Sequence, residues 1–107
     1  MAVPKRKRER NRLDIMAEIV ELARTPVLKT SIMYRVRMSY AQLMEYLELL
    51  LRLKYLEVIQ DKESNRTAYR TTKKGLKYLT SYHDIEQLLS KHPIGEDSLL
   101  QIEEDRR

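Results

Sequence analysis

The segment Lys29 to Leu56, KTSIMYRVRMSYAQLMEYLELLLRLKYL, contains two helical patterns separated by the break Arg37-Met38-Ser39. The first pattern is a short helix that Thr30 could cap. Its apolar residues share one face of the helix: Ile32, Met33 and Val36. Two short helices joined by a tight turn predict a helix-turn-helix. Because any helical hairpin gives this pattern, the neighbouring segments must decide what it means.

The second helix begins with a capping-box pattern, in which Ser39 precedes Gln42 by three residues. A helical wheel predicts one buried arc, made of Leu43, Met44, Leu47, Leu50 and Leu51. The opposite arc is mostly polar but includes Leu49 and Leu53. These two leucines suggest that another element or a second subunit covers the far end of the helix.

Before this segment, residues Arg12 to Ala23 have apolar side chains at helical spacing and predict a core-facing helix. Pro26 ends it, since proline disfavours the α conformation of the residue before it. The following pair, Val27-Leu28, could form a single strand bridge.

After the segment, the apolar period changes from helical to alternating. Leu56 to Ile59 and Thr67 to Thr71 read as two strands, and the polar turn between them contains Ser64-Asn65. A hairpin directly behind a helix-turn-helix is the arrangement of a winged helix. The predicted fold class is therefore mainly α with a small β-hairpin (α+β).

A last helix is predicted from Thr72 to about Lys91, before the stop signals Pro93 and Gly95. Leu76 and Leu79 can pack on the domain, and a second stripe has heptad-like spacing: Tyr78, Tyr82, Ile85 and Leu89. At roughly 30 Å the helix is about as long as the domain is wide. We expect the stripe to form a homodimer, and the alternative is that it folds back on its own domain. The predicted organisation is then a basic arm (1–11), a winged helix-turn-helix (12–75), a dimerisation helix (76–92) and an acidic tail (93–107).

Composition narrows the classes of function. The chain has 107 residues, no cysteine and a net charge of +5. Disulfides and thiolate sites are thereby excluded, and neither a signal peptide nor a spanning segment is evident, which predicts a cytoplasmic protein. Residues 24–77 hold twelve basic and five acidic side chains, whereas residues 84–105 hold one and seven. One end of the molecule should attract a polyanion such as double-stranded DNA.

If the second helix enters a major groove, its start would present base-reading side chains, namely Ser39, Tyr40, Gln42, Glu45 and Tyr46. Phosphate contacts are expected from outside that helix, from Lys29, Arg35, Arg37, Lys62, Asn65, Arg66, Lys73 and Lys74. The basic arm could lie along phosphates or enter a minor groove through Lys5, Arg6, Lys7, Arg8 and Arg10. An inert solubilising tail is the alternative for the arm, and simple solubility is the alternative for the hairpin tip.

Specific sequence features carry a resemblance. The run Lys29-Thr30, Ile32-Met33-Tyr34 and Ser39-Tyr40, followed by YRTTKKG at residues 69–75, resembles an archaeal winged-helix family. That family includes small dimeric chromosomal DNA-binding proteins and transcriptional regulators. The resemblance implies a two-fold dimer on double-stranded DNA, with nucleoid association. It also implies that Thr30 and Tyr34 lie near the DNA backbone and that Ser39 opens the recognition helix. Departures from the family pattern are Tyr55, where many relatives have glycine, Thr71, where an apolar residue is usual, and Pro93, which cuts the C-terminal helix short.

No pattern in the sequence favours an enzyme, and we expect neither a cofactor nor a small-molecule ligand. The two histidines, His83 and His92, have no second cluster of metal ligands near them, and no glycine-rich phosphate loop is present. The expected function is a DNA-binding transcriptional regulator. An architectural DNA binder is one alternative, and a protein-interaction module that uses Glu45, Glu48, Leu49 and Leu53 is another.

Overall fold

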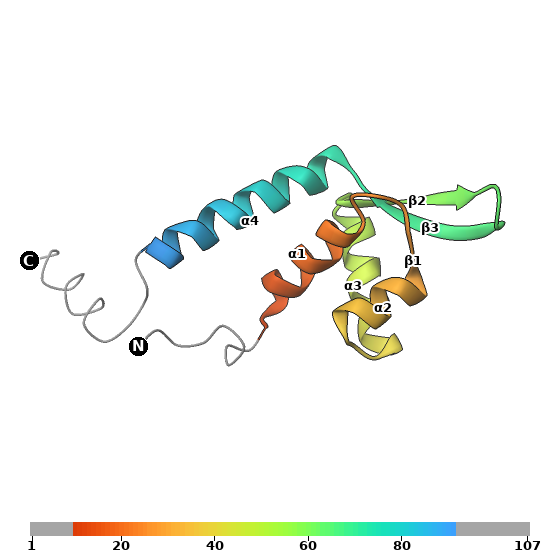
Figure 1. Cartoon of the computed structure of the whole chain (residues 1–107), viewed down its shortest axis with the longest axis horizontal. Helices are drawn as coiled ribbons and strands as arrows, with labels where there is room; N and C mark the ends of the chain where they lie inside the picture. Colours follow the sequence, from red (N-terminus) through yellow and green to blue (C-terminus); the bar gives the residue numbers. More distant parts are fainter. Residues whose placement is uncertain (1–9, 92–107) are drawn as a thin grey trace, which may run out of the picture.

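A computed structural model describes residues 10–91 as four helices and a three-stranded antiparallel sheet (Figure 1). In chain order the elements are α1 (Arg12–Leu22), β1 (Val27–Leu28), α2 (Lys29–Val36), α3 (Tyr40–Arg52), β2 (Leu56–Asp61), β3 (Arg66–Thr71) and α4 (Lys73–Lys91). The predicted fold class is confirmed, including the long C-terminal helix. The predictions for residues Lys5, Arg6, Lys7, Arg8, His92 and the tail 93–107 lie outside the described residues.

α1 begins with a capping box that the sequence reading did not identify. The Asn11 side chain accepts from the Asp14 amide at 2.9 Å, and Asp14 accepts from the Asn11 amide at 3.0 Å. The far end of α1 is held by β3, because the Thr71 amide donates to the Ala23 carbonyl at 2.7 Å and the Thr71 hydroxyl donates to the Val20 carbonyl at 2.6 Å. Thr71 therefore caps α1 from a distant strand.

Replacing Thr71 by valine should lower the free energy of unfolding by about 1 to 3 kcal/mol, because the buried Val20 carbonyl loses its hydroxyl donor while side-chain shape is kept. If α1 continued, the Arg24 amide would donate to the Val20 carbonyl. In the structure the Arg24 amide donates to the Glu21 carbonyl instead. Urea unfolding measures the change. Thr67→Val, at an exposed position of the same strand, is the control. Equal effects of the two substitutions would contradict this role of the Thr71 hydroxyl.

The turn between α2 and α3 follows the predicted break. α2 begins at Lys29 with Leu28 as a cap that makes no side-chain hydrogen bond, so the prediction that Thr30 caps this helix is wrong. Arg37 ends α2 in the left-handed conformation, with φ 57°. The capping box at the start of α3 is confirmed: Ser39 Oγ accepts from the Gln42 amide at 3.2 Å, and Gln42 Oε1 accepts from the Ser39 amide at 3.3 Å.

The core lies between the helices and the inner face of the sheet. Its fully buried large side chains come from α1, α2 and α3: Ile19, Val20, Ile32, Val36, Leu43, Leu47 and Leu50. Leu49 and Leu53 are partly buried against this core within the same chain. The expectation that a further element or subunit must cover them is therefore not needed.

β3 is the central strand of the sheet, in the order β1-β3-β2. Val27 pairs with Tyr69, which confirms the predicted strand bridge, and Leu56 to Asp61 pair with Thr71 to Arg66. At the tip of the hairpin, Asp61 accepts from the Glu63 amide at 3.2 Å and from the Ser64 hydroxyl at 2.7 Å. The hydrogen bond from Ser64, followed by that from the Glu63 amide, holds the pKa of Asp61 below its ordinary value.

α4 is capped by Thr72, whose hydroxyl accepts from the Gly75 amide at 3.0 Å and donates to the Lys54 carbonyl at 2.6 Å. Tyr55 is the position at which relatives were expected to have glycine. The residue in the left-handed conformation is instead its neighbour Lys54, with φ 67°. Tyr55 instead stacks on Tyr78, with ring centroids 5.1 Å apart. The turn after α3 and the start of α4 are thereby joined.

The first half of the α4 stripe packs on its own chain. Tyr78 donates to the Leu13 carbonyl at 2.6 Å, and Tyr82 donates to Asp14 at 2.5 Å. Both tyrosines are partly buried against the core, so this half of the stripe that we expected to face a second copy already has contacts within its own chain. Ile85 remains exposed, as does Leu89. Leu79 is buried as expected, whereas Leu76 is 42% exposed and does not pack on the domain.

The contact of Tyr78 with α1 predicts a loss of stability at high pH. Burial, followed by the negative charges of Tyr55 and Asp14, raises the pKa of Tyr78 from 10.0 to about 12. Between these two pH values the unfolded chain releases this proton while the folded protein retains it, so the contribution is complete below pH 10 and is lost as the pH rises towards 12. Denaturant unfolding across this range should show Tyr78→Phe losing less stability than the wild type. Parallel losses would show that Tyr78 is not the group responsible.

Candidate nucleic-acid interface

The starts of α2 and α3 meet at one exposed surface. Lys29 Nζ lies 3.4 Å from the Tyr40 hydroxyl and 5.4 Å from the centroid of its ring. Eleven residues separate the two side chains, and no sequence signal pairs them. The contact fixes a cation beside the first turn of the helix that was predicted to read DNA.

The stretch of chain that forms this surface contains basic residues and no acidic residue. Between Glu21 and Glu45 the chain has no acidic residue. It has four basic residues there: Arg24, Lys29, Arg35 and Arg37. Arg35 and Arg37 are exposed near the end of α2. We call the partly buried Lys29 and the exposed side chains Thr30, Tyr34, Arg35, Arg37 and Tyr40 the α2–α3 surface.

Two tyrosines of the α2–α3 surface are strongly exposed, Tyr34 at 85% and Tyr40 at 57%. An aromatic ring this accessible contributes little to the core of its own chain. Its hydroxyl can donate to a phosphate oxygen, and its ring can contact sugar or base. The surface therefore combines cations with rings that have the chemistry to bind a nucleic acid.

The predicted base-reading residues differ in how freely they can act. Ser39 and Gln42 occupy each other in the capping box, where Gln42 Oε1 lies 3.3 Å from both the Ser39 amide nitrogen and the Ser39 hydroxyl. Tyr46 is partly buried against the core. Tyr40 and Glu45 are exposed. Of the predicted set, these last two have side chains that are not occupied by the cap or the core.

The β2–β3 hairpin, which is the wing of this fold, carries equal numbers of basic and acidic side chains at its tip. Lys62 and Arg66 are exposed at its tip, and Asn65 accepts from the Gln60 amide group at 3.4 Å. Asp61 and Glu63 lie in the same turn, so the tip has no net charge. Figure 1 shows the wing and α4 extending from the helical body in opposite directions.

The structure does not bring the other predicted phosphate contacts to the α2–α3 surface. Lys73 and Lys74 begin α4, and Lys74 Nζ lies 5.9 Å from the centroid of the Tyr55 ring. Tyr55 follows the C-terminal end of α3, whose 13 residues span roughly 20 Å. Arg10, assigned to the basic arm, forms two 2.9 Å contacts with Glu18 of α1.

A sequence model of the family described as winged helix-turn-helix matches residues 9–90. The chain belongs to this family. The match covers every helix and strand described above except the last residue of α4. A comparison with curated proteins gave no match.

Several solved structures have the same fold as this winged helix-turn-helix protein. Sso10a-2, a DNA-binding protein from Sulfolobus solfataricus, has a TM-score of 0.70 and 19% identity, over 92% of this chain and 98% of its own. MepR of Staphylococcus aureus, in a complex with DNA, has a TM-score of 0.63 and 12% identity, over 88% and 80%. The adhesin competence repressor of Streptococcus pyogenes has a TM-score of 0.60 and 14% identity, over 85% and 72%. At these identities the comparisons show the fold alone.

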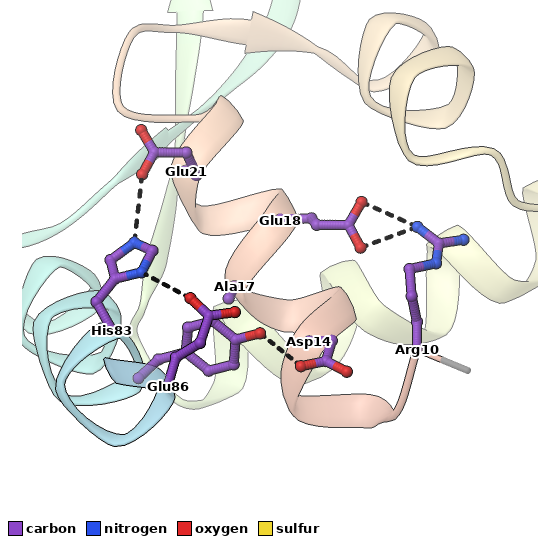
Figure 2. A pocket seen from close by; sticks show the side chains of 8 residues that line it. Arg10, Asp14, Ala17, Glu18, Glu21, His83 and Glu86 are labelled. Carbon is purple, nitrogen blue, oxygen red and sulfur yellow. Dashed lines mark hydrogen bonds and ion pairs between the residues drawn. The ribbon is translucent and has the colours of Figure 1, made fainter. Parts of the chain in front are cut away.

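An open cleft of about 290 Å³ lies between α1 and α4, away from the α2–α3 surface (Figure 2). Several acidic side chains line it, and they have partners: Glu18 contacts Arg10 at 2.9 Å, and His83 lies 3.9 Å from Glu21 and 3.5 Å from Glu86. Within residues 10–91, no group of three histidine or acidic side chains is arranged to hold a metal ion. None of the helices in this range has the length and apolarity needed to cross a bilayer.

Proposed function

We propose that this winged helix-turn-helix protein binds double-stranded DNA as a homodimer and regulates transcription, in the cytoplasm and on the nucleoid. The α2–α3 surface carries the proposal, because Lys29 lies beside the first turn of α3, and the exposed Arg35 and Arg37 precede that turn in a stretch of chain without acids. A polyanion is the partner that such a surface attracts. The role needs neither catalysis nor a bound cofactor.

A groove-binding arrangement follows from the order of these elements. In helix-turn-helix proteins the second helix enters the major groove by its N-terminal residues, and the first helix crosses the backbone. On this chain α3 would enter the groove, and Thr30, Tyr34 and the α2 cations would contact phosphates. Lys62, Asn65 and Arg66 on the wing would reach the adjacent backbone. Sso10a-2 is a DNA-binding protein and MepR has been solved in a complex with DNA, which supports the same use of this fold.

The distal part of α4 supports a dimer. Ile85 is 57% exposed, Leu88 61% and Leu89 43%, and within residues 10–91 no other element covers them. We propose that a second copy of α4 covers this face. Such a dimer would present two α3 helices to two half-sites of one duplex.

Two observations bear on the alternatives. Leu49 and Leu53 pack on the core, and Glu48 contacts Arg52 at 2.9 Å, so three of the side chains expected to face a protein already have partners. This weakens the protein-interaction module. An architectural DNA binder would use the same α2–α3 surface and would differ from a regulator in lacking base preference.

Duplex binding measured by fluorescence anisotropy over a range of salt tests the proposal. Affinity should fall with a slope of about −0.9 in log K per log salt for each phosphate neutralised. The double variant Arg35→Gln with Arg37→Gln should lose roughly tenfold in affinity at moderate salt and should have a shallower slope. Lys77→Gln, at an exposed position of α4, removes a charge outside the surface and should change little. A flat salt dependence, or equal losses per charge in both variants, would sink the proposal.

A further inference from the structure

Glu45 is the unusual residue of the exposed face of α3. It lies one helical turn after Ala41 and about opposite the buried residues Leu43, Leu47 and Leu50. It is exposed, and its side chain makes no hydrogen bond or ion pair with any other residue in the range 10–91. Glu48, on the same face, contacts Arg52 at 2.9 Å and is neutralised by it. Glu45 is therefore an acid without a described partner, next to a basic surface.

A free carboxylate at this position opposes DNA binding in general. In the proposed complex it would lie in a groove between two rows of phosphates, where like charges repel. It would reduce affinity for every sequence unless a donor on a base edge compensated it. Major-groove donors are the exocyclic amines, and the cytosine N4 amine is the one that glutamate accepts from.

The capping box adds a second reason to look to Glu45. Gln42 would be the ordinary adenine reader on this helix, because its amide can both donate and accept. Here its oxygen is already placed 3.3 Å from the Ser39 amide nitrogen, so paired reading of adenine would break one of the two hydrogen bonds of the capping box. Ala41, one turn before Glu45, is too short to shield it. Glu45 is the long polar side chain on this face that remains available.

We infer that Glu45 is a specificity-determining residue of the protein, which accepts a hydrogen bond from the N4 amine of a cytosine in the major groove. The inference rests on the proposed function and deepens it. The carboxylate is repelled by the phosphates in every complex with DNA. Only a complex in which a cytosine N4 amine donates to it compensates this repulsion. The acidic residue on this DNA-binding surface thereby gives the protein a preference for one DNA sequence.

Selection from a pool of randomised duplexes, with the full chain, tests the inference. Wild-type protein should enrich cytosine at one position of each half-site, and replacing that cytosine should weaken binding roughly tenfold. Glu45→Ala should lose this preference while binding other sequences more tightly. Glu48→Ala removes the same charge one turn along the helix, so it should strengthen binding generally and keep the cytosine preference.

The outcomes separate this inference from the proposed function. If Glu45→Ala keeps the preference, or if both variants tighten binding equally on all duplexes, Glu45 repels phosphates and reads nothing. A wild-type protein that binds duplex with steep salt dependence but no base preference also overturns the role of Glu45, and it leaves DNA binding intact. Absence of duplex binding by the wild type, with the folded state verified by circular dichroism, overturns both.

Discussion

Replacement of Gly75 by alanine is expected to destabilise the protein by about 3 kcal/mol or more, a large part of the stability of a small domain. A Cβ atom at this position would lie 2.3 Å from the Tyr55 carbonyl oxygen and 2.8 Å from Thr71 Cγ2. The oxygen belongs to the backbone and also accepts from the Thr72 amide at 3.0 Å, so it cannot move aside alone. The start of α4 would have to shift away from the turn after α3.

The sign of the effect makes this prediction sharp. Without a close contact, alanine would stabilise a helical position by up to about 1 kcal/mol relative to glycine. Thermal and urea unfolding of Gly75→Ala should instead show a loss. Thr80→Ala, an exposed position on the same helix, is the control and should stay within about 0.5 kcal/mol of the wild type. A stabilised Gly75→Ala would mean that α4 does not approach Tyr55 as described.

Local patterns predicted most of the fold. Helical stripes placed α1 and α3, the Ser39 and Gln42 pair placed the start of α3, and alternation placed the hairpin. The misses concern contacts between elements far apart in the chain. Thr71 caps α1 from a position 51 residues away, and Tyr78 reaches Leu13 across 65 residues. Such contacts depend on how elements pack, which periodicity does not encode. The Asn11 box was a local signal that could have been read.

The candidate site was predictable in kind but not in detail. Composition indicated a basic surface around α2, yet the contact between Lys29 and Tyr40 depends on how two helices cross. Helix spacing assigned Tyr78 and Tyr82 to a dimer stripe, because a wheel cannot tell which part of a long helix its own domain covers. The structure divides that stripe into a covered half and an exposed half.

The exposed half gives the second large expectation, which concerns assembly. Replacing Ile85 and Leu88 by glutamine should convert a dimer into a monomer. Each substitution removes about 1 kcal/mol of favourable apolar burial from the interface. Both substitutions occur in both copies, so the free energy of dimerisation falls by about 4 kcal/mol, or roughly a thousandfold in dissociation constant. Glutamine favours helix and adds no charge, so neither α4 nor the attraction to DNA should change.

Charge supports a second copy as the partner of this face. The first turns of α4 carry Lys73, Lys74 and Lys77, whereas Asp84 and Glu86 lie further along. In a dimer whose two-fold axis is perpendicular to α4, the two helices run antiparallel, which directs the basic start of each α4 towards the half of the other helix that carries Asp84 and Glu86. That arrangement is self-complementary, as an isologous interface requires.

Mass measured by sedimentation or light scattering decides the matter. Wild-type protein should have twice the chain mass of 12.8 kDa, and the Ile85 and Leu88 double variant should have the single mass. Leu76→Gln is the control, because Leu76 is also an exposed leucine of α4 but lies on another face. The double variant should also lose roughly a hundredfold in duplex affinity, because its second α3 no longer binds from the same assembly. A monomeric wild type, or a double variant that stays dimeric, would contradict pairing through this face.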